Sequence, residues 1–237
     1  MKRILLFSFI CFISNESFGQ IEFKNSNIGR QMNFVDLNGY SFLKKYDPDI
    51  TGTPFINDNW AFAKITLSGG KEINQLPIKL NIESNELYFL DSTGKEMIAV
   101  EGLIKKIDYL NYSPKDSIRY VFKSGYPNID KQNENYYYQV FTEGKIELLA
   151  KKLKYIRVDK NELSGEVSRN FVEAAIILYV YANNIIQAFY PNKGFVISLM
   201  KDKEQAINMF VDTNKINFRK TMDLIKLFNY YNGLERQ

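Results

Sequence analysis

Short apolar or alternating runs, each closed by a turn signal, fill the chain from residue 33 to about residue 157. The clearest example alternates over Ile78–Ile82, turns at Glu83-Ser84-Asn85 and continues at once in a second run over Glu86–Leu90. Parallel strands would need connections of about a dozen or more residues, usually helical, and the gaps here are shorter. The pattern therefore predicts antiparallel strands joined by tight turns.

The strand-like pattern continues, less regularly, to residue 190. Between residues 145 and 157 helical and alternating spacings compete, and the alternation favours a strand. The polar, aperiodic stretch Lys160–Asn170 predicts a loop. Apolar runs then flank Asn183-Asn184, a pair that tolerates the positive φ of tight hairpin turns. We expect a hairpin there.

Helical periodicity marks the end of the chain. Asp202 with Gln205 fits a capping box, and Gly233 fits a helix end. The predicted inward residues are Ala206, Ile207, Phe210 and Val211 before a stop at Asn214, and Met222, Ile225 and Phe228 in a second helix that starts near Phe218. The expected fold is a single α+β domain over residues 20–237. An antiparallel β-meander (β-rich over 33–190) precedes a C-terminal helical hairpin (202–232).

The first nineteen residues have the composition of a secretory signal peptide. Met1-Lys2-Arg3 is positively charged, Ile4–Ile13 is apolar, and the small residues Ser17 and Gly19 fit a cleavage site after Gly19. A membrane span needs about 20 apolar residues, and this run is about half as long. We expect export from a bacterial cytoplasm, cleavage, and no membrane span afterwards.

The residue types available restrict the chemistry. The chain has no histidine, and its one cysteine, Cys11, lies within the predicted signal peptide, with Ile10 in the place where lipidation needs a small residue. Ser-His-Asp triads, Cys-His pairs and His- or thiolate-bound metals are thereby excluded, as are disulfides. The 31 Lys and Arg residues alternate with 27 acidic ones and form no basic block, so we do not expect nucleic acid as a partner.

Carboxylate chemistry remains available. Glycoside hydrolysis needs two acids roughly 5 to 10 Å apart, but sequence spacing selects no pair. The candidates are Asp47, Asp49, Asp58, Glu83, Glu86, Glu101 and Asp108.

One stretch has the spacing of a calcium loop. Asp47, Asp49 and Thr51 stand at the first, third and fifth positions, Gly52 at the sixth and Asp58 at the twelfth. Alternate side chains would point inward, and glycine would permit the sharp turn. The alternative is an Asp-Pro turn that enters the first long strand. The metal prediction is calcium at Asp47, Asp49, Thr51 and Asp58.

Structural motifs recur in order along the chain: Gly52-x-Pro54-Phe55 leading to Trp60, turns at Gly69-Gly70 and Ser92-Thr93-Gly94, and a helical end that closes on Tyr230-Tyr231-Asn232. With a mature start at Gln20, this order resembles a group of small secreted proteins of Gram-negative bacteria with no assigned activity. The resemblance implies a periplasmic or extracellular location and supplies no catalytic residues.

Two functional hypotheses follow. The leading one is a non-enzymatic envelope or secreted module that binds a ligand or an envelope protein. The alternative is a carboxylate-dependent, glycosidase-like hydrolase of envelope or environmental polymer. An enzyme should gather acids in one concave pocket, whereas a binding module should expose an apolar or aromatic patch.

Overall fold

The computed structural model describes residues 29–31, 46–112 and 117–234. The predicted signal peptide, its cleavage site and Cys11 lie outside these residues. Within them, no helix is long and apolar enough to cross a membrane.

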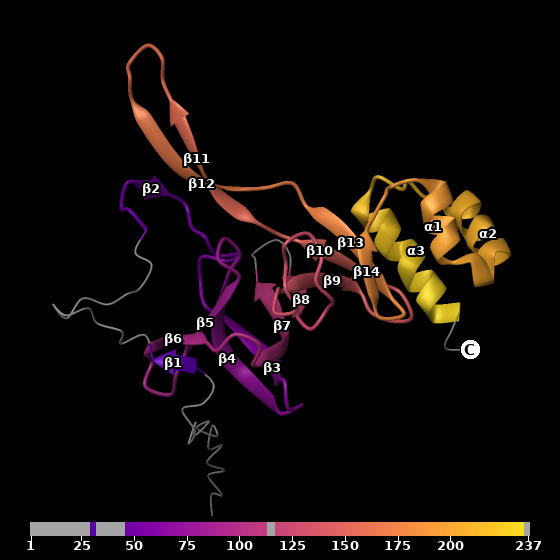
Figure 1. The fold of residues 1–237 in the computed structure, drawn as a ribbon, viewed down its shortest axis with the longest axis horizontal. Helices are drawn as coiled ribbons and strands as arrows, with labels where there is room; N and C mark the ends of the chain where they lie inside the picture. The colour runs from indigo at the N-terminus through magenta and orange to yellow at the C-terminus, as the bar shows by residue number, and fades with distance from the viewer. Residues whose placement is uncertain (1–28, 32–45, 113–116, 235–237) are drawn as a thin grey trace, which may run out of the picture.

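Antiparallel pairing dominates the structure (Figure 1). Eleven of the described strands form one sheet in which every neighbouring pair is antiparallel, as predicted. In spatial order these strands are β1 (Gly29–Gln31), β6 (Glu96–Ala99), β5 (Glu86–Leu90), β4 (Glu72–Asn81), β3 (Ala61–Leu67), β7 (Ile104–Tyr112), β8 (Ser117–Lys123), β9 (Tyr138–Thr142), β10 (Glu147–Lys151), β13 (Ile177–Ala182) and β14 (Ile185–Ala188).

Most neighbours in this sheet are consecutive hairpins. Asn183 and Asn184 take φ of 51° and 62° between β13 and β14, which confirms the predicted hairpin turn. Three pairings in the described sheet are not between consecutive strands: β1 pairs with β6, β3 with β7, and β10 with β13. These pairings join the hairpins into one surface.

The chain between β10 and β13 supplies two strands of a separate three-stranded sheet, which projects from the body (Figure 1). Its strands are β11 (Lys154–Lys160), β12 (Val167–Glu173) and the short β2 (Ile50–Thr51). We call β11, β12 and their connecting turn the arm. The loop predicted over Lys160–Asn170 is wrong at Lys160, which ends β11, and from Val167 onward, where β12 begins. The first residues of β12 are exposed, so their sequence shows no apolar alternation. β2 also departs from the antiparallel prediction, since it runs parallel to β12.

The C-terminal segment of the described chain is helical, as predicted, but it holds three α-helices and not two. They are α1 (Lys193–Leu199), α2 (Glu204–Asn214) and α3 (Thr221–Leu234), with a 3-10 turn, η2 (Lys201–Lys203), between the first two. The predicted cap at Asp202 is wrong, because the N-cap of α2 is Lys203. Asp202 lies in η2, where its carboxylate pairs with Lys145 and accepts a hydrogen bond from Tyr231.

The buried face of α3 differs in part from the prediction. Phe228 is buried, together with Leu224, Leu227 and Tyr231, but Met222 is 66% exposed. The helix begins at Thr221, so Met222 lies in its first turn, beside the buried stripe. The prediction that Met222 points inward is therefore wrong.

The Asn232 side chain attaches α3 to the sheet. Its Oδ1 accepts from the Ile146 N–H (3.1 Å), and its Nδ2 donates to the Ile146 carbonyl (2.9 Å), so the buried amide pairs as a strand residue would. A Cβ at Gly144 would stand 2.4 Å from Asn232 Cγ, which leaves room only for glycine. The helical layer and the β9–β10 hairpin are thus tied at one buried amide.

Removing that amide should destabilise the protein. Asn232→Ala leaves a buried N–H and a buried carbonyl unpaired, each costing about 1–3 kcal/mol, so we expect the free energy of unfolding to fall by about 2 kcal/mol or more. Asn229→Ala, on the exposed side of the same helix, should stay within about 0.5 kcal/mol. Urea denaturation measures both. Equal effects of the two variants would contradict this role of Asn232.

Buried phenols predict a loss of stability at high pH. Burial, with smaller effects of Glu86 and Asp130, raises the pKa of Tyr88 and of Tyr138 to about 12. An unfolded tyrosine ionises near pH 10, so the folded state retains protons that the unfolded state loses. These two phenols should leave the free energy of unfolding unchanged up to about pH 10 and lower it as the pH rises towards about 12. Urea titrations with absorbance at 295 nm test this, and Tyr138→Phe should make the fall shallower.

Candidate functional site

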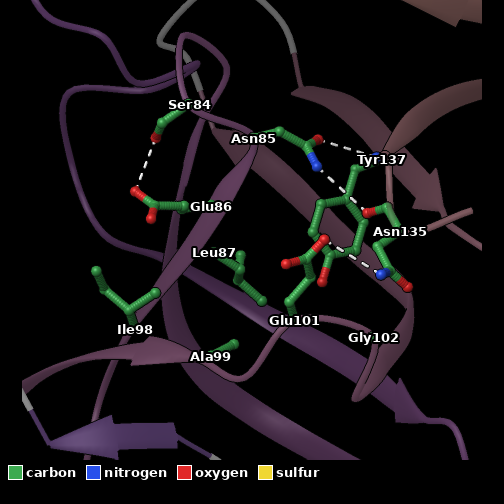
Figure 2. Close-up of a pocket in the computed structure, with 10 residues that line it drawn as sticks. All are labelled: Ser84, Asn85, Glu86, Leu87, Ile98, Ala99, Glu101, Gly102, Asn135 and Tyr137. Carbon is green, nitrogen blue, oxygen red and sulfur yellow. Dashed lines mark hydrogen bonds between the residues drawn. The ribbon is translucent and has the colours of Figure 1, made fainter. Parts of the chain in front are cut away.

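A pocket of about 170 Å³ opens where three connecting segments meet at one end of the β4–β7 strands (Figure 2). These segments are the β4–β5 turn, the β6–β7 turn and the loop that leads into β9. Figure 2 shows Ser84 and Glu86 on one side, and Glu101, Asn135 and Tyr137 on the other. The remaining lining residues are Asn85, Leu87, Ile98, Ala99 and Gly102.

Turn chemistry positions the first side of the pocket. The buried Asn81 side chain accepts the backbone N–H groups of Glu83 (3.0 Å) and Ser84 (3.1 Å), which folds the chain back after β4. Asn85 then takes a φ of 59°, a left-handed conformation that asparagine tolerates better than most residues. β5 follows at once, so Ser84 and Glu86 both come to the pocket.

The Asn85 amide joins this turn to a segment fifty residues later. Its Nδ2 donates to the Asn135 carbonyl (3.2 Å), and its Oδ1 accepts from the Tyr137 N–H (3.0 Å). Gly102 supports the contact from the β6–β7 turn, since a Cβ there would lie 3.0 Å from Asn135 Oδ1. The loop near residue 135 is therefore fixed by hydrogen bonds to its backbone and by close packing of the Asn135 side chain.

Two carboxylates line the pocket, and each uses one oxygen internally. Glu101 Oε1 accepts from the amides of Asn133 and Asn135, both at 3.2 Å. Glu86 Oε2 accepts from the hydroxyls of Ser84 (2.8 Å) and Tyr88 (3.4 Å). The second oxygen of each glutamate accepts no hydrogen bond from the residues that the structure describes.

These two carboxylates differ from most acids on the sheet in having no basic partner in the described part of the chain. Lys123 bridges Glu143 and Glu147, and Arg119 pairs with Asp108. Among the described residues, no lysine or arginine lines the pocket. Its charge is therefore negative, and its accessible polar groups are mainly hydrogen-bond acceptors.

The neighbouring phenols stay protonated at neutral pH. Burial, and to a smaller degree Glu101, raises the pKa of Tyr137 well above its ordinary range. Tyr88, beside Glu86, is shifted in the same direction. Neither phenol adds negative charge, so the charge of the pocket comes from Glu86 and Glu101.

Among the seven acids named from the sequence, the structure brings Glu86 and Glu101 into this pocket. Glu83 accepts a hydrogen bond from Tyr46 (2.8 Å), and Asp108 forms its ion pair with Arg119 on the sheet. The sequence offered no signal for the pair, because the pocket depends on two turns and on a loop near residue 135. Of these, only the Asn85 turn was marked by its residue types.

Asp47, Asp49 and Thr51 lie in or just before β2, which pairs with the middle of β12, whereas Asp58 lies near Lys154 at the start of β11. Asp47 Oδ1 accepts from the Asp49 N–H (3.1 Å), and Asp47 Oδ2 pairs with Arg169 of β12 (3.1 Å). The Thr51 hydroxyl donates to Asn170, opposite it in the β2–β12 pair. No cluster of three or more acids able to hold a metal occurs in residues 46–112 and 117–234. These contacts compete with calcium binding, which stays a prediction.

Calcium would stabilise the folded protein if it bound here, because a ligand of the native state alone raises the unfolding free energy. The prediction is a rise in melting temperature with added calcium that Asp49→Ala removes. Asp91→Ala, in the β5–β6 turn, is the matched control. If millimolar calcium left the melting temperature of the unsubstituted protein unchanged, the prediction would be contradicted.

Several tyrosines of β9, of β13 and of the loop before β9 belong to the core. Tyr138 and Tyr179 are fully buried, with ring centroids 5.5 Å apart, and Tyr126 packs edge-on against Tyr138. Tyr190 is exposed. Tyr126, Tyr138 and Tyr179 therefore stabilise the sheet and are not free to stack on a ligand, whereas Tyr190 is accessible.

Comparisons of the chain with models of protein families, with curated proteins and with solved structures find no match. The resemblance to small secreted proteins of Gram-negative bacteria stays a prediction.

Proposed function

We propose that this chain is a non-enzymatic binding module, exported through residues 1–19 to the periplasm or exterior of a Gram-negative bacterium, and that the Glu86–Glu101 pocket holds its ligand. The observation that carries the proposal is the pair of carboxylates that share one pocket without a basic partner in the described residues. Glu86 is partly buried, although Glu101 is exposed, and a partly buried charge is unfavourable unless it is compensated. A bound cation would supply the compensation.

The ligand class follows from the groups that remain available. The free oxygens of Glu86 and Glu101 can accept hydrogen bonds from a donor-rich cation, and charge-assisted bonds are stronger than neutral ones. Leu87, Ala99 and Ile98 add an apolar surface for a short alkyl chain. A volume of about 170 Å³ suits a small molecule or one side chain of a peptide. A primary alkylammonium group has these properties.

A hydrolase remains the second candidate, because two carboxylates in one pocket are also what glycoside hydrolysis requires. One acid must then be protonated to donate to the leaving group. Here each carboxylate already accepts hydrogen bonds from two side-chain groups. Each carboxylate therefore has one oxygen held within the protein and one left to accept from a bound donor, which favours binding.

The binding proposal is tested by titrating the protein with n-butylamine and, as an uncharged match, n-butanol. Isothermal calorimetry should show saturable binding of the amine alone. Glu86→Gln and Glu101→Gln should each weaken it about tenfold or more, as expected for a charge-assisted hydrogen bond of about 1.5–3 kcal/mol. Glu72→Gln removes a carboxylate that pairs with Lys64 outside the pocket and should have no effect.

The two candidates give different outcomes in a second assay. Release of soluble fragments from purified peptidoglycan by the unaltered protein, abolished by Glu86→Gln or Glu101→Gln, would establish the hydrolase and contradict the non-enzymatic module. Amine binding without such release supports the module. Binding that survives both substitutions would place the ligand elsewhere.

A further inference from the structure

The arm presents an open sheet edge. In its sheet the order is β11–β12–β2, so β11 is an outer strand with no described strand on its other side. The arm projects away from the main sheet and the helices (Figure 1). Val158 on β11 is 59% exposed, and Leu163 at the tip is fully exposed. An edge strand presents a row of unpaired N–H and C=O groups, which can pair with another chain.

The backbone groups that face outward on β11 are defined by its pairing with β12. The Ala174 N–H donates to the Leu153 carbonyl at one end of the arm, and the Asn161 N–H donates to the Glu166 carbonyl at the other. Hydrogen-bonded residues alternate along an antiparallel strand. Leu153, Asn161 and the odd-numbered residues between them therefore face β12. The N–H and C=O groups of Ile156, Val158 and Lys160 are left for a partner.

The charged side chains of β11 favour one register for antiparallel pairing with a second copy of the strand. An antiparallel pair of β11 strands with its two-fold axis at Val158 places Arg157 of each copy opposite Asp159 of the other. It also places Ile156 opposite Lys160, and all the outward backbone groups meet in register. A two-fold axis one residue earlier would set Arg157 against itself and Lys154 against Lys160. Like charges directly opposite destabilise a sheet, so the register centred on Val158 is preferred.

Within one chain, Arg157 Nε already pairs with Asp159 Oδ2 at 2.8 Å on the same face of β11. Two copies would bring these pairs together as four alternating charges. The interface would be isologous, with the same residues on both sides, as two-fold dimers require.

We propose that two copies of this chain associate through their arms by antiparallel pairing of β11 with β11 about a two-fold axis at Val158. The three-stranded sheets become one six-stranded sheet, with the two bodies at opposite ends. This inference is independent of the proposed pocket function.

Charge exchange tests the interface. Asp159→Arg places guanidinium groups opposite each other twice per dimer and should weaken dimerisation about tenfold or more in analytical ultracentrifugation, since juxtaposed like charges are strongly unfavourable. Arg157→Asp combined with Asp159→Arg restores both the internal pair and the pair between copies, and it should return the dimer constant to within about threefold of the original. A double variant as monomeric as the single one would overturn the proposal. So would an unaltered chain that is monomeric at about 1 mM.

A cysteine placed on the axis gives a second measurement, which does not depend on charge. In a Cys11→Ser background, Val158→Cys faces its own copy at about 5.5 Å between Cα atoms, a separation that suits a disulfide. Lys160→Cys is the matched control, because it faces Ile156. Mild oxidation should give a covalent dimer of the first variant at least about fivefold faster than of the second. Equal rates, or no dimer from Val158→Cys, would overturn the register and with it the proposal.

Discussion

The pairing of β3 with both β4 and β7 is the constraint on which the rest of the sheet depends. Every hairpin on either side of β3 is local, but β3 brings residues 61–67 against residues 104–112 and so joins two meanders. Ala63, Ile65 and Ile107 are fully buried along this seam. Without the seam, the described strands would form two separate sheets, and the apolar side chains buried along the seam would lose their partners.

The pocket is a consequence of that seam. The β4–β5 and β6–β7 turns reach the same end of the sheet because the strands that carry them lie in one continuous ladder. Asn85 then captures the loop near residue 135 through two hydrogen bonds to backbone groups. The polar pocket thus consists entirely of connecting segments and strand ends, while the strands behind it supply a rigid apolar base. Loops held on a rigid sheet are where binding residues are commonly found.

Backbone N–H and C=O groups are satisfied differently at the helical end of the molecule and on the arm. At the helical end, Asn232 satisfies the buried N–H and carbonyl of Ile146, and a glycine at position 144 makes room for it. On the arm, the outward groups of Ile156, Val158 and Lys160 stay exposed along an edge. Burial requires internal partners, whereas an exposed edge can use water or a second chain.

Short-range signals determined the strand and helix types, the tight turn at Asn183-Asn184 and the chemistries excluded by the absence of histidine, because each depends on residues close together in the sequence. Only the tertiary structure decided the β3–β7 and β10–β13 junctions, the arm and the pairing of Glu86 with Glu101 in one pocket. The partners in those contacts lie tens of residues apart, and no local pattern encodes which strands become neighbours. The sequence did not predict β12, because both faces of this strand are largely solvated. A strand without a buried face shows no alternation of apolar and polar residues.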